Sequence, residues 1–122
     1  MLNFNPDFME WTKEASCAYH PDPDLWHYES SRWLDEQELN AMRIAEAKSI
    51  CQSCPVKAQC LAEGMKEENT IQVGNYVNGT IWGGMMFIER VALKEGKPMK
   101  EQAEWKLLRQ ANKHLKRILN EA

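Results

Sequence analysis

Residues 51–61 read CQSCPVKAQCL, and this stretch decides how the chain folds. It holds three of the four cysteines of the chain, which lie on both sides of Pro55. The preceding segment, residues 35–50, consists mostly of good helix formers without glycine or proline, so a helix is expected to run directly into the first cysteine. Pro55 ends this helix and is well placed to open a second one over residues 55–68, with Cys60 on its second turn. The stretch is therefore expected to be an elbow between two helices.

The remaining segments also favour helices, with one interruption. Apolar residues at helical spacing predict a short helix that ends near Ser16, and the prolines of residues 20–24 prevent it from continuing. Glycine and asparagine residues between 69 and 84 indicate a tight turn or a short hairpin. Further helices are expected over residues 85–95 and 100–120. The expected fold class is all-α, a small bundle of four to five short helices with a glycine-rich turn.

The composition is that of a small globular protein. A chain of 122 residues is long enough for one compact domain, and its hydrophobic share of 43% and mean hydropathy of −0.61 fit a soluble protein. No stretch approaches the roughly 18 apolar residues of a membrane span, and residues 1–4 lack the pattern of a secretory signal. A cytoplasmic location is therefore expected. Reducing thiol pools disfavour disulfides there, so four cysteines indicate metal or redox chemistry.

The formal net charge of −3 conceals an asymmetry along the chain. Residues 1–40 carry 9 acidic side chains against Lys13 and Arg32, so residues 41–122 carry a net charge of +4. The basic part could approach nucleic acid, or it could simply form a solvated surface. Residues 105–120 contain no acid and are the best candidate for binding DNA phosphates, through Lys106, Arg109, Lys113, Lys116 and Arg117.

The cysteines follow the spacing C-x33-C-x2-C-x5-C, since Cys17 lies far upstream of the other three. Thiolates are soft ligands that suit zinc or an iron-sulfur cluster. Structural zinc usually takes two close pairs of ligands, and only Cys51 and Cys54 form such a pair. A cluster is wider than one ion and suits ligands from several helices better, although the spacing leaves zinc and free thiols open. A disulfide reductase is disfavoured because its cysteine pair would follow a strand.

Several motifs together resemble the WhiB-like family of actinobacteria and their phages. Trp11 precedes Cys17, and residues 23–26 (PDLW) are similar to the aspartate-leucine-aromatic segment of that family. Residues 51–61 look like its C-x2-C-P-V-x4-C-L core, and residues 81–84 (IWGG) look like its tryptophan-glycine-glycine turn. The combination of these motifs in this order is specific, although each alone would be weak.

The resemblance implies a WhiB-like iron-sulfur cluster domain over residues 1–96, followed by a basic amphipathic helix over residues 97–122. It implies that the small helical bundle is wrapped around a 4Fe-4S cluster, with the ligands Cys17, Cys51, Cys54 and Cys60. The chain departs from the family pattern at Thr80, where a glycine usually precedes the apolar residue of the turn, and in the apolar residues 85–88.

The resemblance also implies partners. Proteins of this family are transcription regulators that bind the C-terminal region 4 of the principal sigma factor, and here the contacts would come from Trp11, Trp26, Trp82, Gly83 and Gly84. The basic C-terminal part of such proteins is associated with promoter DNA, and the cluster is a candidate redox sensor. An enzyme is not expected, because the three histidines lie far apart and all four cysteines serve as ligands. The alternative is a zinc-stabilised protein-interaction module without redox sensing.

Overall fold

The computed structural model describes residues 13–18, 20–30, 33–66, 71–73, 76–96 and 103–121. The elements along these residues are η1 (Pro23–Trp26), β1 (His27–Glu29), α2 (Leu34–Gln52), α3 (Lys57–Gly64), β2 (Ile71–Val73), β3 (Tyr76–Thr80), α4 (Phe87–Glu95) and α5 (Ala103–Glu121). The helix expected to end near Ser16 falls mostly outside the described residues, and residues 13–18 form turns. Among the described helices, none is both long and apolar enough to cross a membrane.

The two helices beside the cysteine elbow are confirmed. α2 begins after Trp33 with two acidic residues in its first turn, where carboxylates interact favourably with the positive end of the helix dipole. It continues to Gln52, so Cys51 lies in its last turn. α3 begins two residues after Pro55 and carries Cys60 at the end of its first turn. The proline therefore separates the helices, as its missing amide and fixed φ require.

The all-α prediction is wrong in one respect, because the described residues include a small antiparallel sheet in the order β1-β3-β2. β2 and β3 form the hairpin expected between residues 69 and 84, whereas the sequence does not predict β1. Tyr28 in β1 pairs with Gly79 in β3, and a Cβ atom at Gly79 would lie 2.5 Å from the Tyr28 hydroxyl oxygen. Gly79 therefore makes room for an aromatic ring rather than for a turn.

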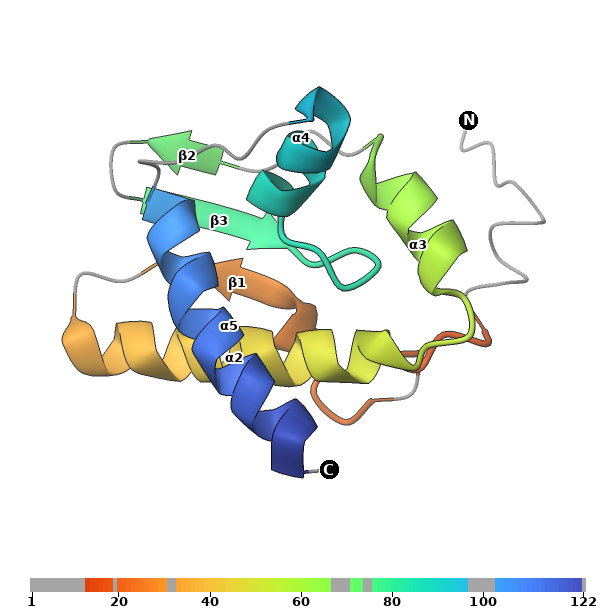
Figure 1. The fold of residues 1–122 in the computed structure, drawn as a ribbon, viewed down its shortest axis with the longest axis horizontal. Coiled ribbons are helices and arrows are strands. Elements are labelled where there is room, and N and C mark those ends of the chain that lie inside the picture. Colours follow the sequence, from red (N-terminus) through yellow and green to blue (C-terminus); the bar gives the residue numbers. More distant parts are fainter. Residues whose placement is uncertain are drawn as a thin grey trace.

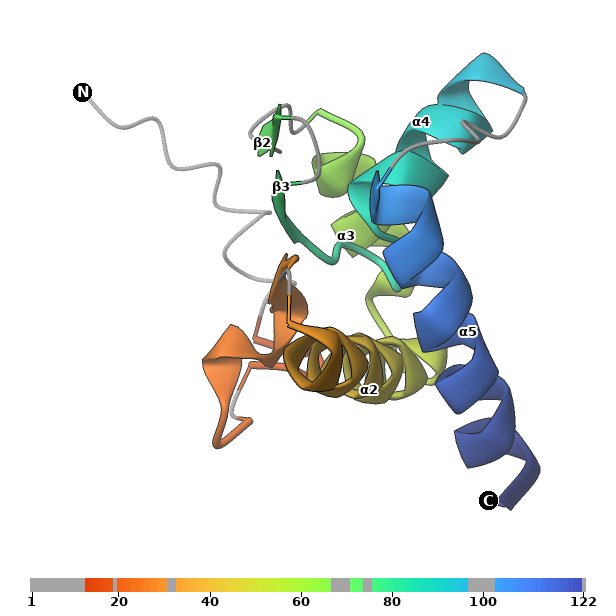
Figure 2. The same cartoon turned by 90° about the vertical axis from the view of Figure 1, so that its left-hand side faces the viewer.

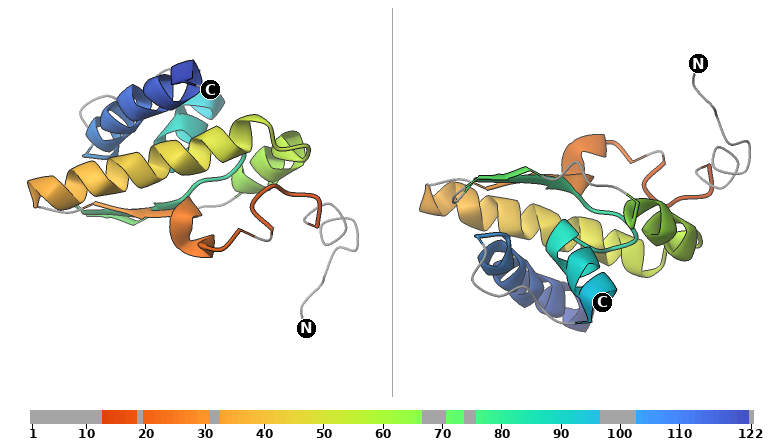
Figure 3. Two further views of the ribbon diagram at one scale, coloured as in Figure 1. Left: turned by 90° about the horizontal axis from the view of Figure 1, so that it is seen from below. Right: turned by 90° about the horizontal axis from the view of Figure 1, so that it is seen from above.

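α2 lies between the sheet and α5 (Figures 1 and 3). The view along α2 in Figure 2 shows the strands on one side of this helix and α5 on the other. Small side chains on α2, among them Ala41, Ala45 and Ala47, are completely buried and let the other layers approach closely. The core between the layers is apolar and includes Leu25, Ile44, Val77, Ile88, Leu107 and Leu108.

α5 packs across α2 along an apolar stripe. Leu108 and Leu115 are buried and Trp105 packs against the core, as the helical spacing predicts. The same helical spacing from Trp105 through Leu108 and Leu115 predicts that Leu119 also docks the helix, and this prediction is wrong because Leu119 is 46% exposed. The reason is that the last turns of α5 extend past α2 (Figure 1).

Candidate functional site

All four cysteines line one pocket of about 430 Å³. The pocket is lined by residues from the end of α2, the start of α3 and residues 15–17. These segments lie close together in Figure 1. Cys51 comes from α2, Cys54 from the elbow, Cys60 from α3 and Cys17 from the N-terminal segment. Cys51 is buried and the other three are partly exposed. The structure thus brings all four predicted ligands to one site, although they come from separate segments.

Three of the sulfur atoms accept hydrogen bonds from N–H groups in or beside the pocket wall. The pairs are Trp26 Nε1 to Cys51 Sγ (3.2 Å), the Gly83 amide to Cys60 Sγ (3.1 Å) and the Ser16 amide to Cys54 Sγ (3.4 Å). Such donors favour negative charge on sulfur. They therefore support the thiolate form that any soft metal requires.

Burial raises the pKa of Cys17, Cys51 and Cys60 in this pocket. It raises the pKa of Cys60 to about 11, and the Gly83 amide opposes the change. For Cys17 and Cys51, repulsion from neighbouring cysteines adds to the increase in pKa. A bound metal centre would add positive charge and favour the ionised sulfurs.

A tight turn from Trp82 to Met85 forms part of the pocket wall. The backbone amides of these two residues donate to each other's carbonyl oxygens at 3.0 Å. Gly83 and Gly84 have φ values of 59° and 80°, the positive pair that a type I′ turn requires. Gly83 also approaches α3, since a Cβ atom there would lie 2.5 Å from Leu61 Cβ. Both glycines are thus needed to bring the Gly83 amide to the sulfur.

The predicted partner-binding tryptophans have different surroundings. Trp82 lines the pocket and is partly buried, with its Cβ packed so closely on Gly64 that no side chain would fit there. Its Nε1 atom is covered and has no hydrogen-bond partner within the described part of the chain. Trp26 is only 7% exposed and faces Cys51. Trp11 lies outside the described residues.

The donor set of the pocket is compatible with an iron-sulfur cluster. Four thiols line the pocket, and its remaining wall is largely apolar, with the side chains of Pro23, Ile50 and Ile81. Lys57 also lines the pocket and would favour negative charge on the sulfurs.

The five basic side chains predicted to contact DNA are all exposed on α5. They recur at three- and four-residue spacing, so they share a face that points away from the buried Leu108 and Leu115. None of the five belongs to the cysteine pocket. They are Lys106, Arg109, Lys113, Lys116 and Arg117.

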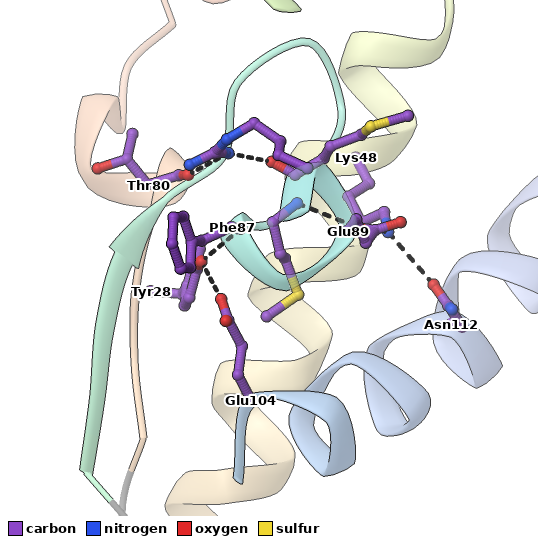
Figure 4. Close-up of polar contacts among 10 residues, drawn as sticks. Tyr28, Lys48, Thr80, Phe87, Glu89, Glu104 and Asn112 are labelled. Atoms are coloured by element: carbon purple, nitrogen blue, oxygen red, sulfur yellow. Dashed lines mark hydrogen bonds and ion pairs between the residues drawn. The ribbon is translucent and has the colours of Figure 1, made fainter. Parts of the chain in front are cut away.

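Buried polar side chains beside the glycine turn were missed by the sequence analysis (Figure 4). The Tyr28 hydroxyl donates to the Glu104 carboxylate and accepts a hydrogen bond of 2.9 Å from the Phe87 amide. Glu104 is 0% exposed. Its position four residues before Leu108 puts it on the apolar stripe of α5, and this spacing is the one signal that could have revealed its burial.

A second buried contact joins α2, α4 and α5. Lys48 is 4% exposed and donates to Glu89 over 2.6 Å and to Asn112 over 3.3 Å (Figure 4). A buried charge that is paired in this way holds the helices in register, whereas an unpaired one would be costly. Nothing in the sequence distinguishes Lys48 from the exposed lysines.

These features define a class of protein, a small and mostly helical domain that gathers four cysteines around one pocket beneath a glycine turn. Residues 11–93 match the family described as transcription factor WhiB, and the chain belongs to this family, as its motifs predict.

Curated relatives agree with this membership. The chain is 34% identical over 86 residues to the transcriptional regulator WhiB1 of Mycobacterium tuberculosis, covering 70% of this chain and 86% of that protein. It is 31% identical over 93 residues to the redox-responsive transcriptional regulator WhiB3 of Mycolicibacterium smegmatis (75% and 84%), and 28% identical over 89 residues to the transcriptional regulator WhiD of Streptomyces coelicolor (73% and 69%). These names confirm a regulator of transcription rather than an enzyme. No solved structure matches the chain significantly.

Proposed function

We propose that this chain is a cytoplasmic transcription regulator that binds a 4Fe-4S cluster through Cys17, Cys51, Cys54 and Cys60. The observation that supports the cluster most directly is that all four thiols line one pocket. N–H donors on three of the sulfurs add to this support. A bound cluster would keep the sulfurs ionised and could exchange electrons. The relative named redox-responsive is compatible with a sensing role.

The proposed protein partner is the C-terminal region 4 of the principal sigma factor, which would dock beside the glycine turn. Trp82 is the more exposed of the two described tryptophans at the pocket, and a large aromatic ring held by rigid glycines is a suitable binding hot spot. Gly83 and Gly84 would shape this surface, while Trp26 supports it from beneath and Trp11 contributes from the N-terminal segment.

Promoter DNA is the proposed partner of α5. Its five exposed basic side chains share one face, and phosphate contacts of this kind supply affinity without reading the sequence. The sigma factor would then select the promoter, and the basic helix would strengthen the complex.

Replacing Cys54 with alanine tests the cluster. The full-length chain is purified without oxygen, and its iron, acid-labile sulfide and binding to a sigma region 4 fragment are measured. Cys54→Ala should lose the cluster and the sigma binding together, because the remaining three thiols cannot complete the ligand set. Ser53→Ala, at the exposed neighbouring position, is the control and should behave as wild type. Wild-type protein that contains zinc and no sulfide would identify the zinc-stabilised module instead.

Replacing Trp82 with alanine tests the docking surface. Co-purification with the sigma fragment should fall at least tenfold, as expected when a hot-spot tryptophan is truncated. Iron and sulfide content, measured on the same sample, shows whether the cluster is retained. The control is Trp33→Ala, which removes a tryptophan that is 58% exposed at the start of α2. If Trp82→Ala keeps wild-type sigma binding, the interface lies elsewhere.

A further inference from the structure

A buried arginine holds the ends of the glycine turn. Arg90 on α4 is only 3% exposed. Its Nη1 atom donates to the Thr80 carbonyl oxygen at 3.0 Å and to the Met85 carbonyl oxygen at 2.7 Å (Figure 4). The first carbonyl lies two residues before the turn, and the second belongs to its last residue. A single guanidinium nitrogen therefore ties both sides of the turn to α4.

A buried carboxylate from α5 supports the start of the helix that carries Arg90. Glu104 is completely buried, and burial raises the pKa of its carboxyl, while the Tyr28 hydroxyl and the charge of Arg90 oppose this change. The Tyr28 hydroxyl donates to Glu104 and accepts a hydrogen bond of 2.9 Å from the amide of Phe87, the first residue of α4. Without Glu104 the Tyr28 hydroxyl would lose its acceptor, so the residues that follow the turn would be held less firmly.

The other side of the turn faces the cysteines. The Gly83 amide donates to Cys60 Sγ at 3.1 Å. A series of contacts thus runs from Glu104 on the last helix, through Tyr28 and the start of α4, to the turn and the Cys60 sulfur. Neither Arg90 nor Glu104 lines the pocket, so both can act only through the turn.

We propose that Arg90 and Glu104 are positioning residues for the cluster site, because they hold the glycine turn and the start of α4 where the Gly83 amide reaches the Cys60 sulfur. The inference rests on the proposed function, because it assumes that the four sulfurs bind a cluster. N–H donors stabilise the extra negative charge of a reduced cluster, so they raise its reduction potential. Displacing the turn should lower that potential, even though no ligand changes.

The experiment compares the full-length wild type with Arg90→Lys and Glu104→Gln, all purified without oxygen. Arg90→Lys keeps the positive charge but replaces the planar guanidinium with a shorter point donor. We expect amide hydrogen exchange of residues 80–86 to rise about tenfold in both variants, as for the loss of one charged hydrogen bond. The potential of the cluster should fall in Arg90→Lys. The control is Glu38→Gln, whose exposed pair with His114 also joins α2 to α5 but lies outside this series of contacts.

Several outcomes would overturn the inference. One is wild-type exchange of residues 80–86 in both variants. Another is a wild-type potential in Arg90→Lys, which would leave only the charge of Arg90 as its role. A third is an exchange increase matched at every amide of the protein, since that would mean general destabilisation. Wild-type iron and sulfide content tests the proposed function separately, and the exchange measurement still tests the positioning role if no cluster is found.

Discussion

At the scale of single residues, position 83 requires glycine for two reasons, its backbone conformation and its close approach to α3. Its φ of 59° is unfavourable for other residues, and a Cβ atom there would lie 2.8 Å from the backbone of Leu61. We expect Gly83→Ala to lower the free energy of unfolding by about 2 to 5 kcal/mol, from left-handed strain and overlap together. Gly96 is the matched control, because its φ is 75° but nothing lies within 4 Å of its added Cβ. Gly96→Ala should cost about 1 to 2 kcal/mol.

Urea unfolding of both alanine variants under anaerobic conditions measures this difference. Equal losses of stability would show that the close approach to α3 is unimportant and that only the backbone conformation matters. Visible absorbance of the cluster is a second readout. It should change in Gly83→Ala alone, because of these two glycines only Gly83 donates its amide to a cysteine sulfur.

Residues with specific chemistry could be predicted from the sequence, and those defined by their surroundings could not. Cysteine, and glycine beside tryptophan, have few common uses, so the sequence could indicate the four cysteines that line one pocket and the glycine turn beside them. Glu104 and Lys48 are ordinary in composition, and their burial depends on partners from other elements. The hydrogen bond from Trp26 to Cys51 was likewise hidden, because the two residues belong to different elements.

At the scale of whole elements, length decided what could be predicted. The long helix α5 shows the helical period over many residues, and α2 is rich in good helix formers. The bounds of both lie within three residues of those expected. β1 has three residues and shows no period, since it exists only by pairing with β3. A strand stabilised by distant partners leaves little trace in its own sequence. The sheet was therefore missed although its hairpin was expected.

α5 carries the prediction that belongs to this scale. Replacing Lys113 and Arg117 with glutamine removes two charges from its exposed face and leaves the buried stripe intact. Affinity for promoter DNA should fall, and the slope of log affinity against log salt should decrease by about 0.9 for each phosphate that is no longer neutralised. Titrations at several salt concentrations measure this slope. Lys94→Gln, on the exposed end of α4, is the control. An unchanged slope in the double variant would remove α5 from the DNA interface.

At the scale of the molecule, the apolar core borders the cysteine pocket and shares Trp26, Cys51 and Ile81 with it. The rest of the core lies between the sheet, α2 and α5 and consists of apolar side chains that need no metal. Residues 13–18 and the glycine turn reach the pocket through backbone hydrogen bonds to sulfur. These pocket segments and the rest of the core should therefore respond differently when the cluster is lost.

Chelation of the iron should loosen the pocket and leave the core folded. The Ser16 amide donates a hydrogen bond to Cys54 Sγ and so links residues 13–18 to the elbow. The Gly83 amide links residues 82–85 to Cys60 in the same way. Amide hydrogen exchange of both segments should accelerate at least tenfold after chelation, because the four sulfurs are then no longer joined by a shared metal centre. The middle of α2 and the buried half of α5 should keep their protection, since apolar packing holds them. If these helices exchange as fast as the pocket segments, the fold as a whole depends on the cluster.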